Sequence, residues 1–291
     1  MKTDRQMKIG IALYLMILIL ILILIAPLAW AQKESPGESE PSKISSTNLP
    51  LTEEQAAAKD ILKRMAEFLA KAQKYSVNVK ASYEVLQESG QKIEFGENRK
   101  VIVNRPNGLR VEAEHSDGEK HFVLYDGKEI TVFTPAEDVY AQITKIGGID
   151  EAVMYFLRDL GMRLPLAMLL TSRLPEELDR RTQTLDYVED TVVDGKPVHH
   201  LAGRTETVDY QVWITKGAKP LPLQIVLTYK SVEGQPDYRA NFSNWDLNPK
   251  IKNTLFAFTP PKGVRKIAFA AQLPKIAHEG PASEAQTGEQ K

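Results

Sequence analysis

The side chains best suited to acid–base or metal chemistry in this 291-residue chain are its histidines, of which only His199 and His200 are adjacent. Neighbouring residues of a β-strand point to opposite faces of the sheet, so these two imidazoles would not converge on one metal ion. The chain has no cysteine, which excludes disulfides, thiolate catalysis and cysteine-ligated zinc, haem or iron–sulfur centres. We therefore expect no metal site and no cofactor, with one histidine half-buried and the other on the surface.

The acidic side chains have explanations that need no catalysis. Glu53-Glu54 and Glu176-Glu177 fall in the first turns of two expected helices, where the helix dipole favours negative charge, and solvation and capping account for the carboxylates. Asp126-Gly127 and Asp194-Gly195 are typical of hairpin turns. The sequence contains no G-x-S-x-G, G-x-G-x-x-G or P-loop motif. We expect a protein that is not an enzyme.

Apolar and aromatic side chains could bind a hydrophobic ligand rather than catalyse a reaction. Aromatic residues interleave with small and polar ones in the last expected strands, where they can form plain core or line an apolar cavity. Such a cavity would hold a lipid by burial, at about 25 cal/mol per Å². The candidate cavity residues are Val79, Tyr83, Leu166, Leu169, Leu170, Tyr210, Tyr229 and Phe242.

The spacing of apolar residues along the chain predicts the helices and strands that position these residues. Thr52 to Gln55 matches a capping box, and an apolar stripe at helical spacing follows it. The period then changes to two, and turn signals separate seven strand-like runs, Lys92–Phe95 and Lys100–Val103 among them. A helical insert from Ile149 interrupts the strands, and about five more follow it.

The fold class that this order predicts is α+β. The strands have one apolar and one polar face, which fits an antiparallel sheet with helices on one face, and a closed barrel would fit as well. The segment Leu164 to Leu170 is very apolar for a connection, so it must lie on something apolar. We expect it to be a mobile cover on the sheet.

The chain ends indicate export. Residues 1–31 combine a basic start, an uncharged run over residues 9–25 and an Ala29-Trp30-Ala31 cleavage site, typical of a signal peptide or, if uncleaved, of a membrane anchor. Residues 32–51 and 273–291 are polar and are expected to be a disordered linker and tail around one domain at 52–272. A net charge of −1 argues against a nucleic-acid partner.

Three turn motifs resemble signatures of the DUF2092 family of predicted periplasmic proteins. They are Asp126-Gly127-Lys128 with Val139-Tyr140-Ala141, the stretch from Asp194 to Leu201, and Trp245 to Pro249 with Phe258 to Gly263. The resemblance spans about Ala58 to Phe269 and implies a periplasmic protein without catalytic residues. The family is similar in shape to lipoprotein carriers of the LolA/LppX type, which implies a curved antiparallel sheet, an incomplete β-barrel, with helices packed on its concave face.

Two functions remain open from the sequence. The first is a periplasmic carrier or sensor for a hydrophobic ligand, either a lipid or a lipidated protein. The second is a non-catalytic envelope interaction or assembly protein, whose core is fully packed and whose partner is another envelope protein. Membrane contact is expected through residues 1–31, if they stay attached.

Overall fold

The computed structural model of the chain describes residues 52–162, 164–269 and 272. The expected signal peptide or anchor, the linker and the tail lie outside the described residues. Within the described ranges, no helix is both long and apolar enough to cross a membrane.

The first helix, α2 (Glu53–Lys71), begins as the sequence predicts. The Thr52 side chain accepts a hydrogen bond from the Gln55 backbone N–H, and the Gln55 side chain accepts one from the Thr52 N–H, so the capping box is complete. The apolar stripe of α2 is buried, including Leu62, Met65 and Leu69. Local sequence therefore starts the helix, and burial of one face holds it in place.

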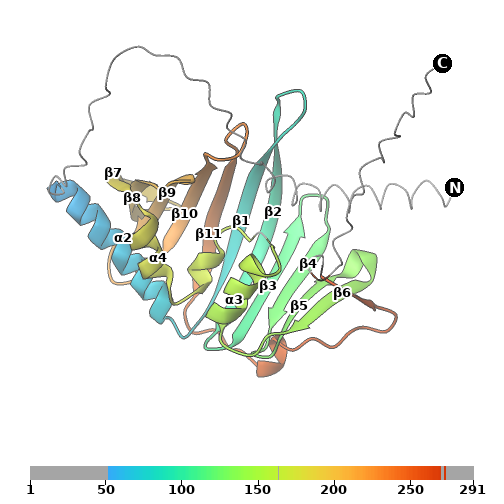
Figure 1. Cartoon of the computed structure of the whole chain (residues 1–291). Coiled ribbons are helices and arrows are strands. Elements are labelled where there is room, and N and C mark those ends of the chain that lie inside the picture. The colour runs from blue at the N-terminus through green and yellow to red at the C-terminus, as the bar shows by residue number, and fades with distance from the viewer. Residues whose placement is uncertain (1–51, 163, 270–271, 273–291) are drawn as a thin grey trace, which may run out of the picture.

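The strands of the described residues form one curved sheet of twelve (Figure 1). Their order is β12-β6-β5-β4-β3-β2-β1-β11-β10-β9-β8-β7. Strands β1 to β6 form one antiparallel meander and β7 to β11 form a second, and the two meanders meet where β11 pairs with β1. The strands are β1 (Lys74–Leu86), β2 (Lys92–Asn104), β3 (Gly108–His115), β4 (Lys120–Tyr125), β5 (Glu129–Thr134), β6 (Val139–Thr144), β7 (Thr184–Val193), β8 (Lys196–Arg204), β9 (Val208–Thr215), β10 (Pro222–Tyr229), β11 (Asp237–Asp246) and β12 (Arg265–Ile267).

Two details differ from the expectation. The runs Lys92–Phe95 and Lys100–Val103 belong to one strand, because β2 pairs with the equally long β1 along its whole length. Gly96, between the two runs, is an ordinary member of that ladder opposite Ser82. The pairings are antiparallel except that of β12, which runs parallel to β6 at one edge.

The helical insert covers the concave face of the sheet together with α2 (Figure 1). It comprises α3 (Ile149–Arg158), the 3₁₀ turn η2 (Ala167–Leu170) and α4 (Leu174–Arg181). The main apolar core lies between this layer and the inner side chains of the strands. The molecule is therefore an α+β protein with an incomplete barrel, filled from the concave side by helices.

Candidate ligand-binding cavity

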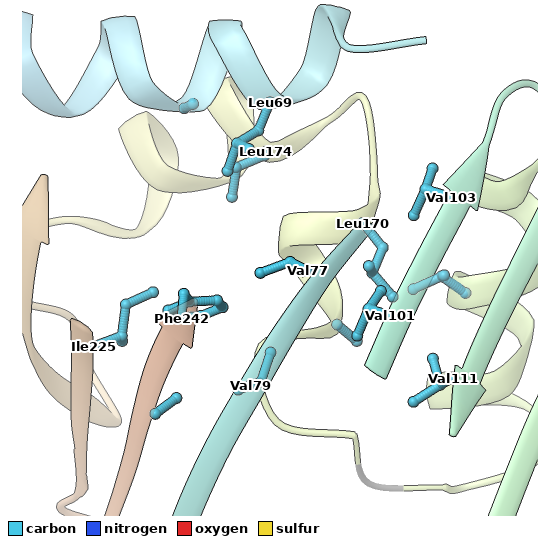
Figure 2. Close-up of a cluster of buried hydrophobic side chains, with 14 of the residues drawn as sticks. Leu69, Val77, Val79, Val101, Val103, Val111, Leu170, Leu174, Ile225 and Phe242 are labelled. Carbon is cyan, nitrogen blue, oxygen red and sulfur yellow. The ribbon is translucent and has the colours of Figure 1, made fainter. Parts of the chain in front are cut away.

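The cover segment, defined as residues 164–170, packs closely on the middle of the sheet. Leu170 projects from η2 towards Val77 and Val101 of the central strands (Figure 2). The hollow that remains under the cover has a volume of only about 50 Å³. We call it the small hollow; it is lined mainly by apolar side chains of β1, β2, β11 and the cover.

The small hollow has a polar side. Arg99 of β2 pairs with the buried carboxylate of Glu97 and donates a hydrogen bond to the Pro165 carbonyl of the cover at 3.5 Å. Its guanidinium also lies over the ring of Tyr238, 5.9 Å from the centroid. Burial raises the pKa of the Tyr238 hydroxyl, so that group stays neutral at physiological pH. A charged side chain of the sheet is thus hydrogen-bonded to the backbone of the cover.

A second hollow is much larger, with a volume of about 540 Å³. We call it the large cavity. It lies beside the cover, with helices α2 and α4 on one side and strands β9 and β10 on the other. Its apolar lining consists of Leu62, Met65, Leu166, Met168, Leu169, Leu174, Leu178, Val208, Tyr210, Val212, Ile225 and Leu227.

The rim of the large cavity is polar. Arg180 and Arg181 at the end of α4, followed by Gln183, form one part of it. The turn between β8 and β9, residues 205–207, forms another. An apolar interior with a few polar groups is the usual make-up of a small-molecule site, and such sites span roughly 300–1,000 Å³. The large cavity matches that description in both size and lining.

Glu177 organises the α4 part of the rim. Its carboxylate accepts hydrogen bonds from Arg180 and, at 2.7 Å, from the Nε of Arg181, and it lies 3.7 Å from Arg173. Burial would raise the pKa of Glu177, but the hydrogen bonds from Arg180 and Arg181 outweigh it and hold that pKa below its ordinary value. Glu177 is only 7% exposed, so its interpretation as a solvated residue is wrong: the arginines, and not water, satisfy it.

The structure brings six of the eight candidate residues together around the cover. They line one or both of the hollows: Val79, Leu170 and Phe242 the small hollow, Tyr210 the large cavity, and Leu166 and Leu169 both. The other two lie elsewhere. Tyr83 stacks on Phe95 with ring centroids 5.8 Å apart, and Tyr229 packs against the edge of the core.

Sequence reasoning missed the rim of the large cavity. The rim joins the end of α4 to a turn between two later strands, and no local pattern connects those segments. One signal was present: Arg180 and Arg181 follow Glu177 by three and four residues, a spacing at which helical side chains pair. That spacing predicts an ion-pair cluster on α4, but it does not predict a cavity beside it.

The two adjacent histidines point to opposite faces, as their strand positions predict. His199 lies 3.0 Å from the Tyr187 hydroxyl and 3.2 Å from Asp190, whereas His200 stacks on Trp213 with ring centroids 4.1 Å apart. The expectation that one of them is a surface residue is wrong, because His199 is half-buried and His200 is 8% exposed. In the described ranges, no three side chains of the ligating types come together to hold a metal ion.

Fold and cavity together define a class: an α+β protein whose curved, incomplete antiparallel barrel holds helices and an apolar cavity on its concave side. The chain belongs to the DUF2092 family, described as "Predicted periplasmic protein", whose model matches residues 58–270. This confirms the family that the three turn motifs indicated. No curated protein matches the sequence.

Several solved structures are similar to this chain at low sequence identity. An uncharacterized conserved protein from Thermus thermophilus is 12% identical, with a TM-score of 0.43, covering 73% of this chain and 99% of its own. The lipoprotein LppX of Mycobacterium tuberculosis is 14% identical, with a TM-score of 0.41, covering 68% and 99%. A LolA superfamily protein from Nitrosomonas europaea is 12% identical, with a TM-score of 0.36, covering 69% and 97%.

Proposed function

We propose that this protein is an exported, non-catalytic binding protein that takes up a hydrophobic ligand, a lipid or a lipidated protein, as a carrier or sensor. The observation that carries the proposal is the large cavity of about 540 Å³ with its apolar lining. Each 100 Å² of apolar ligand surface buried there would contribute about 2.5 kcal/mol of binding free energy before the costs of association. An acyl chain is the simplest ligand that uses such a lining.

The cover supports uptake because it separates the two hollows. Leu166 and Leu169 line both of them, so a ligand that extends from the large cavity towards the sheet must move these side chains. Leu166 has a left-handed backbone with φ of 65°, a conformation that costs a non-glycine residue about 1–3 kcal/mol. We infer that displacement of the cover by a ligand would let Leu166 take an ordinary φ, which would offset part of the cost of opening.

The small hollow favours the second candidate function, an interaction or assembly protein with a packed core. At about 50 Å³ it admits no lipid while the cover is in place. If this second function is correct, the cover stays packed in the core at all times, and the partner is another envelope protein. Ligand uptake by the large cavity separates the two functions.

The test uses the exported protein, purified without detergent, and N-phenyl-1-naphthylamine, a neutral dye that fluoresces in apolar sites. We expect saturable binding to the wild type. Leu178→Trp puts an indole on the wall of the large cavity and should weaken dye binding at least about tenfold. Val188→Trp is the control, because Val188 is 48% exposed on the edge strand β7 and the variant should bind like the wild type. Absence of saturable binding, or equal binding by Leu178→Trp, contradicts the proposal.

A further inference from the structure

We propose that the large cavity prefers an amphiphile with one anionic headgroup, a carboxylate or a phosphate, which Arg180 and Arg181 bind at the rim. This inference rests on the proposed function, because it assigns the headgroup of the same ligand. Both arginines line the cavity and both come from the last turn of α4. Their side chains are 63% and 53% exposed, so a headgroup at the rim can reach them.

The arginines have hydrogen-bonding capacity to spare. Three guanidinium groups, those of Arg173, Arg180 and Arg181, share the single carboxylate of Glu177. Arg180 uses one nitrogen for Glu177 and Arg181 uses its Nε. A guanidinium has five N–H donors in a planar fork that fits carboxylate and phosphate oxygens, so most of these donors are left for a second anion.

The rest of the rim cancels only part of the positive charge of Arg180 and Arg181. Next to the turn at residues 205–207, Asp209 is neutralised by Lys230 at 2.9 Å and lies 3.6 Å from Arg204, and it is not among the side chains that line the cavity. Glu206, an exposed residue of the turn, is the acidic side chain among those that line the cavity. A cationic headgroup would have to lie beside two arginines, whereas an anionic one gains charge-assisted hydrogen bonds from them.

A purely structural role is the competing explanation for the same residues. Arginines in the last turn of a helix interact favourably with the helix dipole, and spacings of three and four residues from Glu177 stabilise α4. That role affects the stability of α4, but it does not make binding depend on the headgroup of a ligand. The discriminating measurement is therefore the ratio of affinities for ligands that share one chain and differ in charge.

The experiment measures displacement of N-phenyl-1-naphthylamine by dodecanoic acid, dodecyl phosphate, dodecan-1-ol and dodecyltrimethylammonium, each below its micelle concentration. We expect an anionic compound to displace the dye at the lowest concentration, and the carboxylate and phosphate arms show which source of negative charge is preferred. In Arg180→Gln/Arg181→Gln the ratio of anionic to neutral affinity should fall about four- to twenty-fivefold, since each of the two exposed charge pairs contributes roughly a factor of two to five.

Two variants keep the result interpretable. Arg180→Lys/Arg181→Lys retains both charges. Its ratio of anionic to neutral affinity should therefore be close to that of the wild type, even if the glutamine variant is less stable. Arg64→Gln, on the exposed side of α2 where Arg64 pairs with Asp60, is the matched control and should keep the wild-type ratio. Equal displacement by all four compounds, or a ratio that the glutamine variant leaves unchanged, overturns this inference while leaving dye binding intact. If neither the dye nor a dodecyl compound binds, the proposed function itself fails.

Discussion

The ring of Tyr210 lies directly against Gly203 of the neighbouring strand, so closely that a Cβ atom on Gly203 would collide with the ring. The two residues are register partners of β8 and β9. The ring lines the large cavity, and its hydroxyl lies 2.9 Å from the Thr182 hydroxyl beyond the end of α4. One glycine therefore lets the sheet hold a tyrosine on the cavity wall and connect it to the helical layer.

Gly203→Ala should displace that ring and disturb the cavity. The added methyl group overlaps the ring, so we expect a loss of about 1–3 kcal/mol in the free energy of unfolding. Dye binding should weaken as well, because Tyr210 can no longer keep its place or its contact with Thr182. Chemical denaturation and fluorescence titration measure the two effects. Gly96→Ala is the control, since its nearest neighbour would lie at an ordinary 3.9 Å; equal behaviour of the two variants would contradict the prediction.

Leu169→Glu tests whether the cover takes part in binding. Leu169 lines both hollows and is only half-buried, so the carboxylate can still reach water in the closed protein. We therefore expect a clear loss of affinity for the neutral dye, with only a small change in the thermal melting temperature. If Leu169→Glu unfolds the domain and no lipid binds to the wild type either, the cover is plain core and the carrier function is wrong.

Arg105 holds three parts of the helical layer to the sheet. It donates to the Ala72 carbonyl at the end of α2 at 3.1 Å and to the Leu170 carbonyl of the cover at 2.9 Å, and it lies 3.7 Å from Asp150 of α3. Arg105→Met should cost about 2–4 kcal/mol of unfolding free energy, because it leaves two partly buried carbonyls without their donor and removes the cation beside Asp150. Lys100→Met, at an exposed site on the preceding strand β2, should cost little in the same denaturation experiment.

His121 should make stability depend on pH. Burial lowers the pKa of His121 from its ordinary value of 6.5, and the nearby His115 lowers it further, against Glu119, Asp117 and Glu97, which raise it. The folded state therefore binds the proton less readily than the unfolded chain. As a result, the free energy of unfolding has its full value above the ordinary pKa of His121, and it decreases as the pH falls from there to the folded-state pKa. His121→Gln should flatten this decline in unfolding experiments between about pH 8 and pH 5; an unchanged slope would show that His121 does not contribute.

Several features of this protein are encoded within a few residues, and the sequence alone was enough to predict them. Asp126 accepts hydrogen bonds from the backbone N–H groups of Lys128 and Glu129, and Gly127 takes the φ of 92° that the turn needs. The capping box at Thr52 and the alternating pattern of β1 are equally local. Because turn chemistry, capping and period depend on near neighbours, they predicted the order of elements, the α+β class and the family.

Contacts between distant segments decided the rest. The merging of two short runs into β2 depended on the length of β1, and the pairing of β1 with β11 joins segments from opposite ends of the domain. The large cavity exists only because helices α2 and α4 lie opposite strands β9 and β10, which are distant from them in the sequence. Whether an apolar side chain is packed or lines an open space depends on how well two surfaces fit, and that fit is a property of the folded chain that periodicity does not carry.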